Sequence, residues 1–265
     1  MTRRLCLITG ASAGIGAAFA EIYARHGYDL ALTARRADRL EAAAADLRAR
    51  HGVEVLVVSA DLTQPGAVDA VLAAVAAQGR VVDALVNNAG FSLAGSYLAS
   101  SWSDQARLLQ VLLQIPAEFA HKVLGGMTAR GFGRIVNVAS VAGLVPGSAG
   151  HTLYGAVKAA MISFSQSLHL ETTGKGVHVT AVCPGFTYSE FHDVNGTRDL
   201  VSRMPNWMWL SADAVAQAGY AAAEANRPMS VPGGAYKAIT KLSKLLPTSA
   251  AMAVMRRQSG RIRRA

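Results

Sequence analysis

Short apolar runs alternate along this chain with longer segments whose apolar residues recur at every third or fourth position. The short runs predict buried strands at residues 5–9, 29–33, 53–59, 84–87, 134–140, 177–183 and 229–231. The longer segments predict helices at residues 17–26, 37–51, 65–78, 103–130, 152–172 and 211–225, the last capped by Ser211. This alternation is typical of an α/β fold, so we predict a doubly wound parallel seven-stranded sheet with helices on both faces.

Composition agrees with one α/β domain. The 265 residues are 51% hydrophobic and 16% charged, which is enough apolar material for a large core. The apolar run at residues 5–8 is too short for a signal peptide, and no stretch has the length of a membrane span. Cys6 and Cys183 lie in apolar runs, which favours buried reduced thiols over disulfides or a metal site. We expect a cytoplasmic location.

The positive net charge belongs to one end of the chain. Of the 26 Lys and Arg residues, eight lie from Gly233 onward with no acidic residue among them, so the other 18 are matched by 17 acidic residues. The nearly neutral body argues against nucleic acid as a partner, because nucleic-acid binding needs a basic face on the fold itself.

Glycines mark the passage from the first strand to the first helix. Gly10, Gly14 and Gly16 have the spacing G-x-x-x-G-x-G. A glycine turn in this place directs backbone N–H groups and the positive helix end at one point, where a pyrophosphate can bind. A plain tight turn is the alternative.

Two arginines, Arg35 and Arg36, follow the second strand, and Ala34 stands where folds that prefer NAD usually carry an acidic residue. Guanidinium groups pair well with phosphate, so we predict NADPH rather than NADH as the cofactor. Solvated side chains at the next helix N-terminus are the alternative, but arginine is unfavourable beside a positive helix end.

The segment from residue 140 to residue 158 carries the candidate chemistry. Tyr154 and Lys158 stand four residues apart, on one face of the predicted helix, and Ser140 ends the preceding strand. A neighbouring ammonium favours the phenolate, so we expect Lys158 to lower the pKa of Tyr154 from its usual value of about 10. Ser140 can supply a second hydroxyl to the same carbonyl oxygen. Two solvated side chains on an ordinary helix are the alternative.

With these motifs in order, residues 3–232 resemble the short-chain dehydrogenase/reductase family. The resemblance is carried by Thr9-Gly10-Ala11-Ser12-Ala13-Gly14-Ile15-Gly16, Asp61-Leu62, Asn87-Asn88-Ala89-Gly90, Ser140, Tyr154-x-x-x-Lys158 and Pro184-Gly185. It implies a Rossmann-type fold and hydride transfer between a nicotinamide and a small-molecule carbonyl or alcohol. It also implies a homodimer or homotetramer, paired through the helices at 103–130 and 152–172.

The resemblance assigns roles by position. Tyr154 is the general acid of reduction, Ser140 holds the carbonyl oxygen, and Lys158 bonds the nicotinamide ribose and lowers the pKa of Tyr154. The implied cofactor contacts are Gly10, Ser12, Gly14, Ile15 and Gly16 at the pyrophosphate, Arg35 and Arg36 at the 2′-phosphate, Asp61 and Leu62 at the adenine, Asn88 and Gly90 at the adenosine ribose, and Thr187 and Ser189 at the carboxamide, with Pro184 and Gly185 also against the cofactor.

Two residues depart from the family pattern. Ala13 stands where many NADPH-using relatives have a basic residue, so phosphate recognition rests on Arg35. Leu112 stands where the family has an asparagine that holds a water between the lysine and solvent. The Leu112 side chain cannot bond that water, although a backbone carbonyl can, and Gln114 points elsewhere along the helix. Because one acid–base contribution is worth about 10²–10⁴-fold, a slow enzyme or a cofactor-binding sensor or scaffold is the alternative.

A lid at about residues 186–210 is the expected substrate side of the catalytic domain at 1–232. Phe91, Leu144, Phe186 and Trp207 are predicted to line the substrate, and the aromatic and methionine content of the lid indicates a bulky apolar ketone. Packing of the lid onto the body is the alternative. His151 is interpreted as a solvated bystander.

Residues 233–265 form a basic C-terminal extension. Apolar residues and lysines alternate at helical spacing through residues 235–246, and Pro247 ends the segment. Such a helix can lie on an anionic membrane surface, where it would serve a lipid-ketone or 3-oxoacyl reductase, or it can pack its apolar stripe on the body or a neighbouring subunit. We expect packing, and we expect residues 256–264 to be a frayed end.

Overall fold

Seven parallel strands form one sheet in the computed structural model, which describes residues 3–93, 95–150, 152–189 and 205–263. The sheet order is β3-β2-β1-β4-β5-β6-β9. The strands are β1 Leu5–Thr9, β2 Asp29–Ala34, β3 Val55–Ser59, β4 Ala84–Asn87, β5 Gly133–Val138, β6 Val177–Val182 and β9 Met229–Ser230. This confirms the predicted seven-stranded parallel sheet. A separate pair, β7 Thr187–Tyr188 and β8 Leu210–Ser211, follows β6.

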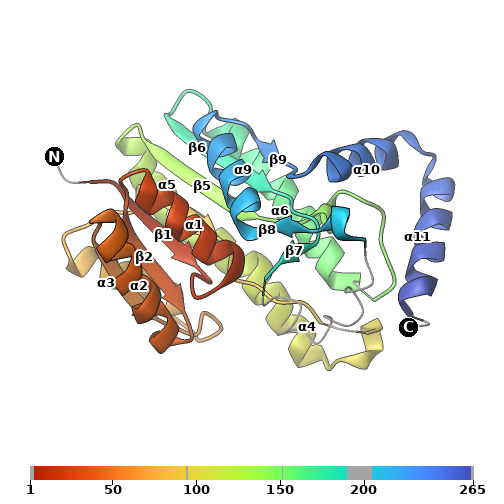
Figure 1. Cartoon of the computed structure of the whole chain (residues 1–265), viewed down its shortest axis with the longest axis horizontal. Helices are drawn as coiled ribbons and strands as arrows, with labels where there is room; N and C mark the ends of the chain where they lie inside the picture. The colour runs from red at the N-terminus through yellow and green to blue at the C-terminus, as the bar shows by residue number, and fades with distance from the viewer. Residues whose placement is uncertain (1–2, 94, 151, 190–204, 264–265) are drawn as a thin grey trace.

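Helices cover both faces of the sheet, as predicted (Figure 1). One layer holds α1 Gly14–Arg25, α2 Ala37–His51 and α9 Ala212–Glu224, and the other holds α3 Ala67–Ala77, α5 Ile115–Ala129 and α6 Thr152–Glu171. Successive strand residues pack against opposite helix layers. Ile8 lies in the core under α1, and Leu7 lies in the core under α5. Cys6 and Cys183 are both buried free thiols, as expected.

Strand register places the functional segments at one edge of the sheet. The order reverses between β1 and β4, and such a switch point opens a crevice at the strand carboxyl ends. In two neighbouring rows at this edge, Asn87 pairs with Asn137 and Val138 pairs with Val182. The residues that follow these strands, among them Asn88, Ser140 and Gly185, therefore emerge side by side.

The predicted unbroken helix at residues 103–130 is wrong in one respect. It consists of α4 Trp102–Leu109, a π-helical segment Gln110–Gln114, and α5. Pro116 explains the change, because proline has no N–H to donate to the carbonyl of Leu112 four residues earlier and its ring crowds that carbonyl. Leu112 lies inside the π-helical segment.

The C-terminal extension holds two helices, α10 Gly234–Leu245 and α11 Thr248–Arg263, which project beyond β9 at one end of the molecule (Figure 1). The expected frayed end is therefore wrong, because the chain is helical through Arg263. Pro247 begins the new helix by accepting a hydrogen bond from the Ala251 amide, and good helix formers follow it. Among the described residues, no helix combines the length and the apolar character needed to cross a bilayer.

Candidate active site

Asn88 and Thr9 fix the glycine turn to the neighbouring strand. The Asn88 side-chain nitrogen donates to the carbonyl oxygens of Thr9 and Gly10, at 3.0 and 3.1 Å. The Thr9 hydroxyl accepts from the backbone N–H groups of Asn88 and Ala89, both at 3.0 Å. The side chain predicted to line the adenosine ribose is thus also the clamp that holds the turn between β1 and α1.

The turn itself fits an anion. Gly10 and Gly14 have φ of 66° and 57°, which only glycine adopts freely, and a Cβ on Gly16 would lie 2.3 Å from the Gly10 oxygen. Ala13 is the N-cap of helix α1 and offers no side-chain hydrogen bond, and the first turn of the helix has no acidic residue. The positive helix end therefore meets no negative side chain of its own, which suits a pyrophosphate. Ser189 lies against Gly14, since a Cβ there would be 2.9 Å from the serine Cβ.

Two arginines stand at the rim of this turn. The Arg36 guanidinium donates to the Ser12 hydroxyl at 3.1 Å. Asp61 accepts from the amide and the hydroxyl of Thr63, and these bonds, with a smaller contribution from the Arg35 charge, hold the pKa of Asp61 below its usual value. Arg35 thus lies near Asp61 and Arg36 reaches the glycine turn, so three of the residues predicted to meet the adenosine half of a cofactor lie at this rim.

The other predicted contacts are packed into the walls of this crevice. Leu62 is buried in the core under α5, and Ile15 packs on the core under α1. Gly90 lies against Leu112, because a Cβ on the glycine would be 2.7 Å from a leucine methyl carbon. Their predicted contact with a cofactor remains a prediction.

Ser140 and Tyr154 meet where β5 ends, as predicted. The Ser140 hydroxyl accepts from the Ala142 amide at 3.1 Å and so caps the short helix Val141–Gly143, and it also shares a hydrogen bond with the Tyr154 hydroxyl. Gly143 makes this arrangement possible, because a Cβ there would lie 2.5 Å from the Lys158 carbonyl carbon. The Ser140 turn therefore rests directly on the backbone of α6.

Lys158 is buried beside this pair. It is 7% exposed and its ammonium donates to the Val138 carbonyl at 2.7 Å. Burial lowers the pKa of Lys158 to about 8. Its nitrogen lies 5.6 Å from the centre of the Tyr154 ring.

The expected lowering of the Tyr154 pKa is wrong for this structure. Burial raises the pKa of Tyr154 to about 12, and the hydrogen bond from Ser140 opposes that rise only in part. The physical reason is that desolvation disfavours the phenolate, while the Lys158 ammonium is directed at the Val138 carbonyl.

A residue that the sequence interpretation missed, Tyr236 of α10, holds the segment after β6. Its ring covers Gly185 so closely that a Cβ on the glycine would lie 1.9 Å from a ring carbon. Its hydroxyl accepts from the Phe186 amide at 2.9 Å and donates to the Met208 carbonyl at 2.5 Å. Beyond this clamp, the Thr187 hydroxyl donates to the Gly185 carbonyl at 3.0 Å. No local pattern marks Tyr236, because its partners lie far away in the sequence.

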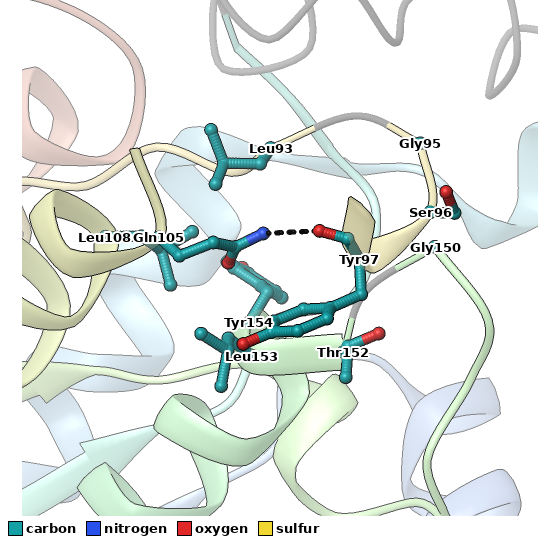
Figure 2. Close-up of a pocket in the computed structure, with 10 residues that line it drawn as sticks. All are labelled: Leu93, Gly95, Ser96, Tyr97, Gln105, Leu108, Gly150, Thr152, Leu153 and Tyr154. Carbon is teal, nitrogen blue, oxygen red and sulfur yellow. Dashed lines mark hydrogen bonds between the residues drawn. The ribbon is translucent and has the colours of Figure 1, made fainter. Parts of the chain in front are cut away.

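A pocket opens beside Tyr154 (Figure 2). Its wall is formed by two loops, helix α4 and the start of α6, with the residues Leu93, Gly95, Ser96, Tyr97, Gln105, Leu108, Gly150, Thr152, Leu153 and Tyr154. Figure 2 shows the Gln105 side-chain nitrogen directed at the Tyr97 carbonyl, at 3.4 Å. The wall thus combines three leucine side chains with several polar groups, and the polar groups supply the larger share of its exposed surface.

None of the four predicted substrate-lining residues is part of the wall of this pocket. Phe91 packs on the Leu108 cluster next to Tyr154, and Leu144 packs on the cluster of Ala139 and Met161. Phe186 contacts the Trp209 ring at 5.7 Å, and Trp207 is 64% exposed. Their contact with a substrate remains a prediction, and His151 and residues 190–204 lie outside the described residues.

Comparisons with known proteins agree with this geometry. A family model described as short chain dehydrogenase matches residues 4–198. The 3-oxoacyl-[acyl-carrier-protein] reductase FabG of Vibrio cholerae is 36% identical over 183 residues, which cover 69% of this chain and 73% of that protein.

Two solved structures extend the match along the chain. A short-chain dehydrogenase from Sphingobium yanoikuyae in complex with NADPH has a TM-score of 0.80 and 33% identity, and the match covers 91% of this chain and 94% of that one. A bulky-bulky ketone specific alcohol dehydrogenase from Comamonas testosteroni has a TM-score of 0.76 and 29% identity, with coverage of 94% and 96%.

Replacing Gly143 with alanine should separate Ser140 from Tyr154. The new Cβ meets backbone atoms of α6, so the turn must move, and a displacement of about 1 Å at reacting groups can cost on the order of 10²-fold in rate. We expect turnover in a carbonyl-reduction assay to fall by about 10- to 100-fold. Gly147→Ala is the matched control, because a Cβ there has no atom within 4 Å. Equal rates in the two variants would refute the role of Gly143.

Tyr236→Phe should destabilise the fold. The ring still fills the space over Gly185, but the Phe186 amide and the Met208 carbonyl each lose a partner. An unpaired buried polar group costs about 1–3 kcal/mol, so urea unfolding should show a loss of that order. Tyr188→Phe, at a residue that is 52% exposed, is the control and should change stability little. A Tyr236→Phe protein as stable as the control would show that the two hydrogen bonds do not hold the segment.

Proposed function

We propose that this chain, which belongs to the short-chain dehydrogenase family and is an oxidoreductase acting on CH–OH or C=O groups, uses NADPH to reduce a bulky apolar ketone. The observation that carries the proposal is the group of Ser140, Tyr154 and Lys158, of which Tyr154 lines a pocket. The glycine turn and the two arginines stand at the same edge of the sheet.

The arginines support NADPH as the cofactor. Arg36 already reaches the Ser12 hydroxyl on the glycine turn, and Arg35 lies near Asp61 at the end of β3. Two guanidinium groups at this rim suit a 2′-phosphate. The Sphingobium dehydrogenase was solved with NADPH, and so was the L-sorbose reductase from Gluconobacter frateurii, which is 27% identical to this chain.

The chain's own groups supply the proton and its placement. The bound cofactor provides the hydride that goes to the carbonyl carbon. Tyr154, held in its protonated form by burial, donates its proton to the carbonyl oxygen. Ser140 donates a hydrogen bond to the same oxygen and keeps it within reach of Tyr154. The Lys158 ammonium, fixed on the Val138 carbonyl, keeps a positive charge beside these hydroxyls below a pH of about 8.

The surroundings of the pocket support a bulky, apolar substrate. Leu93, Leu108 and Leu153 form the aliphatic part of its wall. Large apolar side chains stay exposed on nearby segments, such as Leu98 at 89% and Trp102 at 65%. The Comamonas enzyme acts on bulky-bulky ketones and the Vibrio enzyme on 3-oxoacyl groups, so these two carbonyl classes are the first to test. The buried thiols of Cys6 and Cys183 suit the cytoplasm.

One observation favours a second candidate function, a cofactor-binding sensor or scaffold with little turnover. Leu112 is 2% exposed and fills the cluster of Leu108 and Val157, so it contributes no polar side chain to the site. Pro116 argues against this candidate. It has no N–H to donate to the Leu112 carbonyl in an α-helix. That carbonyl is therefore favoured as a backbone acceptor for the water that the family's asparagine holds.

NADPH consumption against a carbonyl panel separates the two functions. The panel holds bulky ketones, small ketones, aldehydes and 3-oxoacyl thioesters, and NADPH binding is measured in parallel by its fluorescence. We expect the highest kcat/KM with bulky ketones. Tight NADPH binding without turnover on any compound would favour the sensor, and the Leu112→Asn variant would then be assayed for a gain of turnover.

Arg35→Ala should weaken discrimination for NADPH. A charge-assisted hydrogen bond is worth about 1.5–3 kcal/mol, so KM for NADPH should rise by about 10- to 100-fold while KM for NADH changes little. The same charge change at the exposed Arg227 is the control. An unchanged ratio of the two KM values would contradict the assignment of Arg35 to the 2′-phosphate.

The rate should depend on pH through Lys158. Its pKa of about 8 means that its charge is present below that pH and is lost as pH rises through it, whereas the pKa of Tyr154, about 12, keeps that proton in place. We expect kcat/KM for NADPH to be level below pH 8 and then to fall, approaching tenfold per pH unit. A rate that rises through this range would show that a phenolate, and not the protonated Tyr154, is the active form.

A further inference from the structure

Helix α10 docks on the body with a narrow polar face. Tyr236 and Thr240 are 3% and 5% exposed, and both hydroxyls are hydrogen bonded, Thr240 donating to the Tyr236 carbonyl at 2.8 Å. The apolar stripe that we expected to pack on the body or on a neighbouring subunit does not pack on the body. Leu242 is 59% exposed and Leu245 is 80% exposed. Packing on the body is wrong because Tyr236, which holds the segment after β6, occupies the buried side of the helix, and packing on a neighbouring subunit stays a prediction.

Lysines border the exposed stripe. With about 3.6 residues per turn, Ile239, Leu242 and Leu246 lie on one side of the buried face, and Lys237, Lys241 and Lys244 lie on the other. The two sets meet at the outer surface, where Leu245 and Lys241 are one turn apart. A flat surface that approaches α10 from outside therefore meets leucine and lysine together.

Helix α11 also exposes both apolar and basic side chains. Met252 and Val254 of α11 are 48% and 49% exposed, and Arg256 is exposed as well. From Gly233 to the end, the sequence has eight Lys or Arg residues and no acidic residue, whereas the rest of the chain is nearly neutral. The apolar stripe of α10, its lysines and the first turns of α11 form a surface that we call the basic arm.

Charge decides which occupant suits the basic arm. A second copy bound symmetrically would bring the same surface onto itself, with lysines against lysines and no acidic residue to pair with them. Nucleic acid would match the charge but would leave the leucines in water. An anionic bilayer suits both the leucines and the lysines, because leucines enter the boundary between headgroups and acyl chains while lysines bind the lipid phosphates.

We propose that the basic arm binds the surface of anionic lipid bilayers and holds the protein there as a peripheral membrane protein. Leu242 and Leu245 enter the interface, and Lys237 and Lys241 bind anionic headgroups. Because Tyr236 of the same helix holds the Phe186 and Met208 backbone, the bilayer lies on the side of the molecule that carries the segment after β6. This proposal goes beyond the reductase function and does not depend on it.

Vesicle flotation of the full chain at low salt tests the proposal. One vesicle type is phosphatidylcholine alone, and the other is equal parts phosphatidylcholine and phosphatidylglycerol. We expect the protein to float with the anionic vesicles only, and high salt to release most of it. Protein that stays free with both vesicle types would overturn the proposal.

Two double variants assign the binding to the arm. Leu242→Glu/Leu245→Glu should lower the affinity by tenfold or more. Lys237→Gln/Lys241→Gln should also lower it by roughly tenfold or more, since each lysine near an anionic surface is worth about fivefold. The controls are Val81→Glu, at a residue 50% exposed on another part of the surface, and Lys175→Gln/Arg227→Gln, which removes the same charge elsewhere.

Binding by the arm variants that equals binding by the controls would overturn the proposal. So would a change of mass by light scattering in the leucine variant without lipid, because that result would make the stripe a subunit interface. Thermal unfolding of each variant shows that it is folded, and this readout does not require any enzymatic activity.

Discussion

The candidate active site depends on one close contact, the packing of the Ser140 turn on the backbone of α6 at Gly143. Because glycine leaves no Cβ between the two segments, the end of β5 can come near enough for Ser140 to bond Tyr154 and for Lys158 to reach the Val138 carbonyl. That closeness also limits the access of water to Tyr154 and Lys158. Burial then keeps the proton on Tyr154 and lowers the pKa of Lys158 to about 8. The close packing at Gly143 thus sets both the geometry of Ser140, Tyr154 and Lys158 and the protonation of Tyr154 and Lys158.

Local signals in the sequence predicted the sheet, the glycine turn and the Ser140, Tyr154 and Lys158 group, because strand ends, glycine spacing and helical spacing are readable from neighbouring residues. The direction of the Tyr154 pKa was wrong because burial is set by tertiary packing, which spacing does not reveal. Tyr236 was missed for the same reason, as its partners Gly185 and Phe186 lie on a distant segment. Pro116 indicated the π-helical segment, but the spacing of apolar residues on both sides of that segment is that of one unbroken helix.

Leu112 shows how a departure from a family pattern can be absorbed by the fold. Its side chain fills an apolar cluster that supports Tyr154, so its burial is a packing contribution rather than a defect. The polar group that the family places here can come from the main chain, because Pro116 disturbs the helical bonding at this point. On this account the chain remains a reductase, and its C-terminal helices serve two purposes: Tyr236 steadies the segment beside the pocket, and the outer face of α10 remains available to a bilayer.

The most direct test of the central claim is the turnover of NADPH with the best ketone in Tyr154→Phe protein, compared with Tyr220→Phe protein. Tyr220 lies on α9, in the opposite helix layer from α6. The account predicts that the Tyr154 variant loses on the order of 10²–10⁴-fold or more in kcat and still binds NADPH, because it lacks only the acidic hydroxyl. The Tyr220 variant should retain the wild-type rate. Wild-type turnover in Tyr154→Phe protein would contradict the account, since it would mean that the buried group beside the pocket is not the catalytic centre.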